Sequence, residues 1–144
     1  PTLIEYATFF GSIQIFKYFQ HNNVELTNSL WLYAIHGKNP DIIHLLEENH
    51  IDPPNNKYEE CFNEAVKCHH NDIANYFKIN YLDDQNFKFY DLIKYYNFSI
   101  FQYNLINESF FYYLCQNECF TFVKILLFDE KIDVNQKIIF NKLF

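Results

Sequence analysis

LWLYAIHGKNPDIIHLL, residues 30–46, is the stretch that decides the fold. It begins with an apolar turn that holds a small residue, passes through a short polar gap, and ends in a second amphipathic turn with large apolar side chains. Within the gap, Asn39 is a good helix cap and Asp41 complements the helix dipole. Pro40 suits the first helical position, because its missing N–H needs no partner there. The stretch therefore predicts two short helices joined by a tight turn.

The same pattern recurs in three other parts of the chain. The copies are LIEYATFFGSIQIFKYF (residues 3–19), EAVKCHHNDIANYF (64–77) and YLCQNECFTFVKILL (113–127). Superposing them aligns three columns, namely Ala7, Ala34, Ala65 and Leu114; Ile15, Ile42, Ile73 and Phe122; and Phe19, Leu46, Phe77 and Leu126. Self-similarity of this kind is typical of stacked helical arrays. We therefore predict an all-α fold of about four helix pairs whose columns form the core.

The spacing of the copies breaks once. Ala7 and Ala34 are 27 residues apart and Ala34 and Ala65 are 31 apart, but 49 residues separate Ala65 from Leu114. The excess falls in residues 81–106, where FKFYDLIKYY predicts an extra helix. We expect a decayed repeat or a helical insertion in that segment.

Helix signals on either side of this segment predict the later pairs. The third pair is expected at residues 57–68 and 72–80, with Asn71 as the cap of its second helix. The fourth is expected at residues 107–116 and 120–128.

Composition excludes several classes of partner. A formal net charge of −7 without arginine disfavours nucleic acid, because phosphate binding needs a basic stripe and arginine dominates base readout. The lysines are scattered, so an anionic membrane surface is disfavoured too. The sequence holds no run of ~20 apolar residues that could span a bilayer. Four cysteines in 144 residues are too sparse for a disulfide scaffold, so we expect an intracellular, cytoplasmic protein with reduced thiols.

Catalysis finds little support in the residue types. Gly11 and Gly37 are the only glycines, which leaves neither a glycine-rich phosphate loop nor a G-x-S-x-G elbow. Carboxylate neighbours such as Glu47-Glu48 and Glu59-Glu60 are more often solvated helix ends than acid–base pairs. We expect a protein without enzymatic activity or cofactor.

Among possible chemical functions, the sequence offers most support for metal binding. Zinc prefers four thiolate or imidazole ligands in a tetrahedron, and such groups gather at Cys61, Cys68, His69 and His70, with Cys115 and Cys119 one helical turn apart. Against a site, Cys61 falls at an apolar helix position, and adjacent histidines point in different directions. Buried cysteine commonly behaves as a small hydrophobe. We expect no metal, and a zinc-stabilised module remains the less favoured alternative.

The columns and turns resemble the ankyrin repeat. The clearest local matches are GSIQIFKYF after Ala7 (residues 11–19), DIIHLL after Ala34 (41–46), and VKILL with DVN (123–127 and 133–135). Within ankyrin-type proteins, the chain looks like a divergent group of unknown function from parasitic protozoa, through FFGS (9–12), LWLYAIHG (30–37) and CHHND (68–72). The resemblance implies one helical solenoid over residues 1–144, which we expect to be part of a longer array.

The chain also departs from the ankyrin pattern. No copy keeps an intact T-P-L-H start, and Asn22-Asn23 and Asn49-His50 stand where the second helix usually ends in glycine. Asparagine can supply the left-handed backbone that glycine provides there. Because the first period of 27 residues is shorter than the ~33 of an ankyrin unit, the hairpin between pairs should shrink to a plain loop.

The resemblance to ankyrin repeats also implies which residues would contact a protein partner. In ankyrin arrays the residues just after the small pair face the concave surface, and here they are Phe9, Phe10, His36, Gly37, Lys67, Cys68, Gln116 and Asn117. Exposed aromatic residues in such a row would anchor a protein partner. We therefore expect a protein–protein interaction module whose partner is a protein of unknown identity. The alternative is a structural spacer or adaptor without a dedicated partner site.

Overall fold

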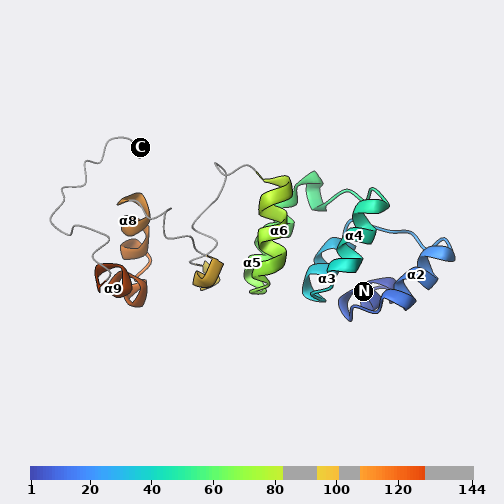
Figure 1. Ribbon diagram of the computed structural model, residues 1–144, viewed down its shortest axis with the longest axis horizontal. Coiled ribbons are helices and arrows are strands. Elements are labelled where there is room, and N and C mark those ends of the chain that lie inside the picture. Colours follow the sequence, from blue (N-terminus) through green and yellow to red (C-terminus); the bar gives the residue numbers. More distant parts are fainter. Residues whose placement is uncertain (83–93, 101–107, 129–144) are drawn as a thin grey trace. The chain divides into compact units, whose positions relative to one another are not determined.

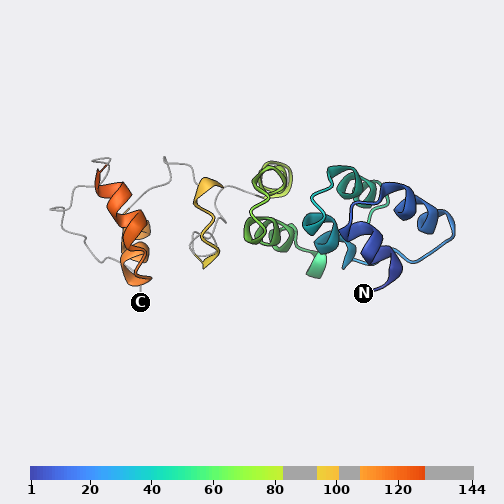
Figure 2. The ribbon, with the colours of Figure 1, turned by 90° about the horizontal axis from the view of Figure 1, so that it is seen from below.

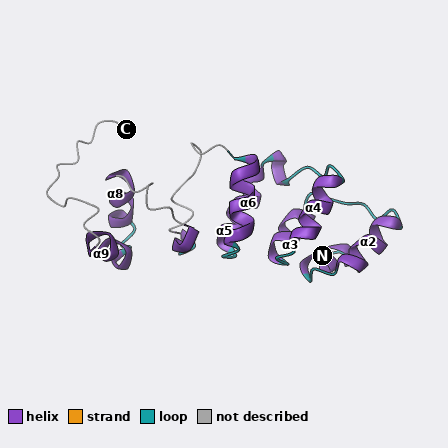
Figure 3. Ribbon diagram, in the orientation of Figure 1, coloured by secondary structure: helices purple, strands orange, loops and turns teal. Residues whose placement is uncertain are grey.

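The computed structural model describes residues 1–82, 94–100 and 108–128. Within these ranges the chain forms helices, turns and loops, and no strand (Figure 3). The predicted all-α class is confirmed. The chain divides into two compact units, Pro1–Ile100 and Phe101–Phe144.

Over its described residues, 1–82 and 94–100, the first unit contains three complete helix pairs (Figure 1). They are α1 (Leu3–Phe9) with α2 (Ile13–His21), α3 (Leu30–His36) with α4 (Pro40–Glu48), and α5 (Tyr58–Lys67) with α6 (Asn71–Tyr81). A short 3-10 helix, η1 (Pro54–Asn56), precedes α5, and another, η3 (Phe98–Ile100), ends the unit. Helix α3 packs against α1 on one side and α5 on the other. In Figure 2 the first helices of the pairs form one layer and the second helices another.

The second unit holds the fourth predicted pair. It consists of α8 (Glu108–Gln116) and α9 (Phe120–Phe128), which pack against each other. The predicted bounds, 107–116 and 120–128, are therefore correct to within one residue. The predicted extra helix lies at residues 87–96, and most of it falls outside the described residues.

The column that begins with Ala7 is buried in both units. Ala7, Ala34, Ala65 and Leu114 are all buried. Small side chains at this position let consecutive first helices approach closely, while larger neighbours fill the remaining space. The largest of these is Trp31, whose ring makes edge contacts with Tyr58 and Phe77 and whose Nε1–H donates to the Ile51 carbonyl (2.9 Å).

The second column is buried in three copies but not in the first. Ile42, Ile73 and Phe122 are buried, whereas Ile15 is 50% exposed, and Phe16 next to it fills the core instead. The expectation for Ile15 was wrong. Helix α2 packs mainly on α1, and the face carrying Ile15 remains in solvent.

The turn inside each pair repeats the same backbone geometry. The second residue after the first helix is left-handed in every pair, at Gly11, Lys38, His69 and Glu118, with φ of 65°, 50°, 59° and 54°. In the first, third and fourth pairs, the next backbone N–H donates to the carbonyl of the small-column residue, Ala7, Ala65 or Leu114 (2.8–2.9 Å). This hydrogen bond closes the turn and satisfies a carbonyl that the helix end leaves free.

The same turn occurs a fifth time where the sequence spacing broke. Tyr96 is also left-handed (φ 54°), follows a helical residue at Lys94, and lies 27 residues after His69. The next residue, Asn97, is buried and accepts a hydrogen bond at Oδ1 from Ser99 Oγ (3.1 Å). The gap of 49 residues therefore contains a repeat turn, which supports the decayed-repeat reading of residues 81–106.

The caps of the second helices are partly as predicted. Asn39 Oδ1 accepts from the backbone N–H groups of Asp41 and Ile42 (3.0 and 3.3 Å), as expected. Asn71, however, is the first residue of α6 and not its cap, which is His70. The Asn71 side chain is engaged elsewhere: its Oδ1 accepts from Asn97 Nδ2 (2.7 Å).

The loops between pairs are short and without strands. Residues 22–29 and 49–57 contain turns and the 3-10 helix η1, so the expected loss of the hairpin is confirmed in both loops. Asn23 adopts the left-handed backbone (φ 56°), as predicted. In the second loop His50 does so (φ 53°) instead of Asn49.

Candidate functional site

The first unit brings the predicted partner-binding residues to one edge. Phe9 ends α1 and His36 ends α3, while Lys67 ends α5. Because α3 packs between α1 and α5, these helix ends are neighbours. We call Phe9, Phe10, His36, Lys67 and Cys68 the turn row. Gln116 and Asn117 hold the equivalent place at the end of α8, in the second unit.

Side chains from successive turns fix the spacing of this row. Asn39 Nδ2 donates to the Gly11 carbonyl (3.2 Å), one turn back along the array. His70 Nδ1 donates to the Ile35 carbonyl (2.8 Å), and Asn97 Nδ2 donates to the Val66 carbonyl (2.8 Å). Asn39 and His70 are the N-caps of α4 and α6, and each of the three donors adds a second hydrogen bond to a carbonyl that already accepts one within the preceding turn. These bonds hold consecutive turns in one register.

The aromatic part of the turn row is exposed. The Phe9 side chain is 41% exposed and Phe10 is 70% exposed. Their rings meet edge to face with centroids 5.2 Å apart, and the Phe9 ring lies 6.0 Å from the imidazole of His36. Phe9 is thus half packed against the next repeat, while Phe10 projects into solvent.

Gly37 explains how closely the first two turns approach. A Cβ atom at this position would lie 2.5 Å from the Phe9 carbonyl oxygen and 2.7 Å from that of Thr8. Both are backbone atoms, so a side chain could be accommodated only by moving one turn away from the other. Gly37 therefore serves the packing of the row and offers a partner no side chain.

The polar part of the row centres on Glu64, which sequence reasoning missed. His36 Nε2 lies 2.7 Å from Glu64 Oε1, and Lys67 Nζ lies 3.2 and 3.3 Å from the two carboxylate oxygens. Cys68 Sγ lies 3.4 Å from His36 Nδ1. The only local signal for Glu64 was its place three residues before Lys67, since residues at this spacing meet on a helix surface.

Two pKa shifts follow from this arrangement. Hydrogen bonding to Glu64 and its charge raise the pKa of the Lys67 ammonium. Burial, and then the charge of Glu64, raise the pKa of the Cys68 thiol, although Lys67 opposes this. The Cys68 thiol is therefore a weaker nucleophile than a free cysteine, because the thiolate is the reactive form.

The zinc ligands considered from the sequence do not converge. Cys61 is buried, and burial raises the pKa of its thiol to about 12. His69 Nε2 donates to the Tyr95 carbonyl (3.1 Å), and His70 is bound to Ile35. Only Cys68 of that set joins a group with metal-binding spacing among the described residues, together with His36 and Glu64.

A second polar centre lies between α4 and α6. Glu47 accepts from the Tyr76 and Tyr81 hydroxyls (2.8 and 2.7 Å) and from His44 Nδ1 (2.9 Å). The ring of Tyr81 stacks on Tyr58 at 3.8 Å. Burial and Glu47 raise the pKa of both Tyr76 and Tyr81.

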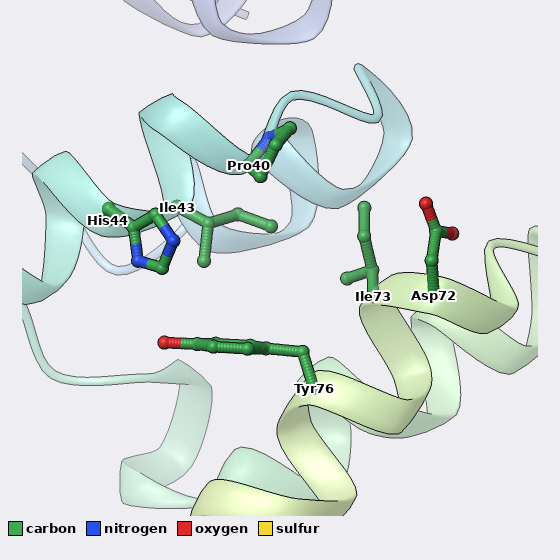
Figure 4. Close-up of a pocket in the computed structure, with 6 residues that line it drawn as sticks. All are labelled: Pro40, Ile43, His44, Asp72, Ile73 and Tyr76. Carbon is green, nitrogen blue, oxygen red and sulfur yellow. The ribbon is translucent and has the colours of Figure 1, made fainter.

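A shallow pocket lies beside this centre (Figure 4). Its volume is about 230 Å³, and it is lined by Pro40, Ile43 and His44 of α4 and by Asp72, Ile73 and Tyr76 of α6. Figure 4 shows the Tyr76 ring along one side, with its hydroxyl directed toward His44. The pocket lies between the two second helices, α4 and α6.

Within the described ranges, no helix is both long enough and apolar enough to cross a bilayer. No match was found among curated proteins or among solved structures. A model of a protein family described as a domain of unknown function (DUF3447) matches residues 21–113. These residues include the second and third pairs and the left-handed turn at Tyr96. Because the match spans more than half of the chain, the chain belongs to the DUF3447 family.

Proposed function

We propose that this chain is a non-enzymatic protein-interaction module, an ankyrin-type helical solenoid that binds another protein through the turn row. The solenoid part of the proposal is supported by the turn geometry, which recurs at Gly11, Lys38, His69 and Tyr96 in the first unit. The inter-turn hydrogen bonds of Asn39, His70 and Asn97 repeat along the same line.

The observation that carries the binding proposal is the exposure of Phe9 and Phe10. Two adjacent aromatic rings in contact, one 70% exposed, present apolar area that costs little entropy to immobilise. Interfaces are enriched in such aromatic anchors, which dominate binding energy when a partner buries them. His36 and Lys67 beside them would supply the polar rim. Gln116 and Asn117 are exposed at the equivalent place in the second unit, where they would be contacts of that unit's own turn.

The competing function is a spacer without a partner site. In that case the exposed phenylalanines would be ordinary surface residues, since scattered exposed apolar side chains need no explanation. The two proposals differ in what Phe10→Ala does to binding.

The test uses a matched pair of double variants. Phe9→Ala with Phe10→Ala removes the aromatic anchor, and Ile15→Ala with Tyr18→Ala removes comparable exposed apolar area from α2. Proteins captured from a lysate of the source cells are identified, and the best candidate is purified and titrated against all three versions. We expect the phenylalanine variant to weaken binding by about tenfold or more, as loss of a hot spot does. The α2 variant should bind like the parent.

Melting curves of the same proteins show whether the Phe10 side chain stabilises the fold or only contacts the partner. Phe10→Ala alone should leave the melting temperature nearly unchanged, because surface substitutions rarely change stability by more than about 0.5 kcal/mol. Undiminished binding by the phenylalanine variant would favour the spacer. A collapsed melting temperature for Phe10→Ala would make that ring a core residue and remove it from the proposed surface.

A further inference from the structure

Three different metal-ligating side chains meet in the turn row. His36 ends α3, whereas Glu64 lies on the last turns of α5 and Cys68 caps that helix. One nitrogen, one carboxylate oxygen and the sulfur all lie within 4.8 Å of one another. His36 Nε2 is 2.7 Å from Glu64 Oε1 and 3.9 Å from Cys68 Sγ. The residues come from two consecutive helix pairs, with His36 lying 28 positions before Glu64 and 32 before Cys68 in the chain.

We propose that His36, Glu64 and Cys68 bind a divalent transition-metal ion, Zn²⁺ by preference, that bridges the second and third helix pairs. The inference goes beyond the proposed partner binding, because it needs no other protein.

The ligand spacing fits a tetrahedral ion. Zinc bonds of about 2.0–2.3 Å to nitrogen, oxygen and sulfur place tetrahedral ligands roughly 3.3–3.7 Å apart. From the present arrangement, the Nε2–Oε1 distance of 2.7 Å must widen and the Nε2–Sγ distance of 3.9 Å must shorten slightly. The Glu64 oxygen and Cys68 Sγ lie within 4.8 Å of each other, and none of the three side chains is fully buried, so rotations about their side-chain bonds can bring the ligands together.

The donor set selects the class of metal. A thiolate with an imidazole is a borderline-soft pair that suits zinc, whereas Ca²⁺ and Mg²⁺ require oxygen ligands. Three protein ligands leave the fourth position open to water, as in zinc sites that are not purely structural. The His36 imidazole also lies 6.0 Å from the Phe9 ring, so the proposed site adjoins the exposed aromatic pair.

Lys67 is the built-in competitor of the ion. Its Nζ donates hydrogen bonds to both oxygens of the Glu64 carboxylate (3.2 and 3.3 Å). The ammonium group must move away before a metal ion can bind to that carboxylate. Its own side chain is about half exposed, so it can swing into water. Removing the lysine charge should therefore strengthen metal binding, which a merely structural role for these residues would not predict.

The first experiment titrates the reduced 144-residue chain with Co²⁺, a spectroscopic substitute for Zn²⁺. We expect one saturable equivalent with a thiolate-to-cobalt charge-transfer band and the intense visible bands of tetrahedral cobalt, both abolished by added Zn²⁺. Cys68→Ser should remove the charge-transfer band. The matched control, Cys115→Ser with Cys119→Ser, should keep it. A band that survives Cys68→Ser, or one that vanishes in the control, would overturn the assignment.

The second experiment measures Zn²⁺ affinity by calorimetry. His36→Gln and Glu64→Gln should each weaken binding by more than the ~10–100-fold that loss of an outer-shell partner costs. Lys67→Gln should tighten it. Far-ultraviolet circular dichroism of each metal-free variant verifies that the helices remain. Wild-type affinity in the His36 or Glu64 variant, or weaker binding by Lys67→Gln, would contradict the proposed ligand set.

Discussion

The first and second helix pairs carry the same sequence pattern 27 residues apart, yet they bury different amounts of it. Leu3 is 72% exposed while Leu30, its counterpart, is fully buried. Likewise Ile15 is half exposed while Ile42 is fully buried. The turn between the helices is nevertheless the same in both pairs.

The difference shows which part of the pattern depends on neighbours. Helix α3 packs between α1 and α5, whereas the main neighbours of α1 are α2 and α3. The second pair has a preceding pair beside it, and the first pair does not. The positions that are exposed in the first pair are therefore those that the first pair covers in the second. In a repeat array each unit buries its faces only against adjacent units, so equal sequences can contribute unequal stability.

The largest effect should come from truncating the same residue in both pairs. Leu30→Ala should cost about 2–5 kcal/mol of unfolding free energy, because it leaves a cavity in the core. Leu3→Ala should stay within about 0.5 kcal/mol, as is usual on a surface. Urea denaturation of both variants measures the difference. Equal losses would mean that the two pairs are equally covered in solution and would break the comparison.

Overpacking the alanine column gives a second contrast. Ala34→Leu should cost about 1–3 kcal/mol, because no space remains beside an alanine enclosed by α1, α4 and α5. Ala7→Leu should cost less, since α1 can shift away from its single row of neighbours. Thermal melts of the two variants test this order. An unchanged melting temperature for Ala34→Leu would refute the repeat alignment itself.

Substitutions in the turns should show the same backbone preference in both pairs, whereas substitutions in the helices should differ in their effect on stability. Gly11 and Lys38 are both left-handed, so a side chain with a Cβ is strained at each. Gly11→Ala should lower stability by about 1 kcal/mol, and Lys38→Gly should raise it by less than that, because glycine also gains entropy in the unfolded chain. Chemical denaturation measures whether each variant raises or lowers the free energy of unfolding. A destabilising Lys38→Gly would show that the Lys38 side chain contributes more than its backbone strain costs.

The smallest effect concerns alkaline pH and the junction of α4 with α6. Burial and Glu47 raise the pKa of Tyr76 and Tyr81 above the ordinary value of 10. The native state then binds these protons more tightly than the unfolded chain, so stability is intact below about pH 10 and falls as pH rises beyond it. Glu47→Gln should flatten this decline. Melting temperatures across that pH range measure it, and an equally steep decline in the variant would exclude Glu47 as the cause.

The sequence predicted most of the positions in the candidate site, but not the contacts between their polar side chains. The resemblance to ankyrin repeats implied the turn-row residues Phe9, His36 and Lys67, and the structure places them at the ends of α1, α3 and α5, two residues before each left-handed turn residue. Glu64 was missed because its partner His36 lies 28 residues away, and no local pattern pairs them. The turn at Tyr96 was missed because aromatic residues there hide the usual turn chemistry.

The sequence by itself determined the helices, the tight turns and the buried alanine column. These depend on periodicity, caps and backbone geometry, which act over a few residues. Only the tertiary structure decided which copies of the apolar columns are covered, since burial depends on a neighbour and not on the pattern. It also decided that Asn97 completes the inter-turn hydrogen bonds and that His36, Glu64 and Cys68 meet. Such contacts form only once consecutive pairs stack, because a side chain can then reach the turn of the preceding pair.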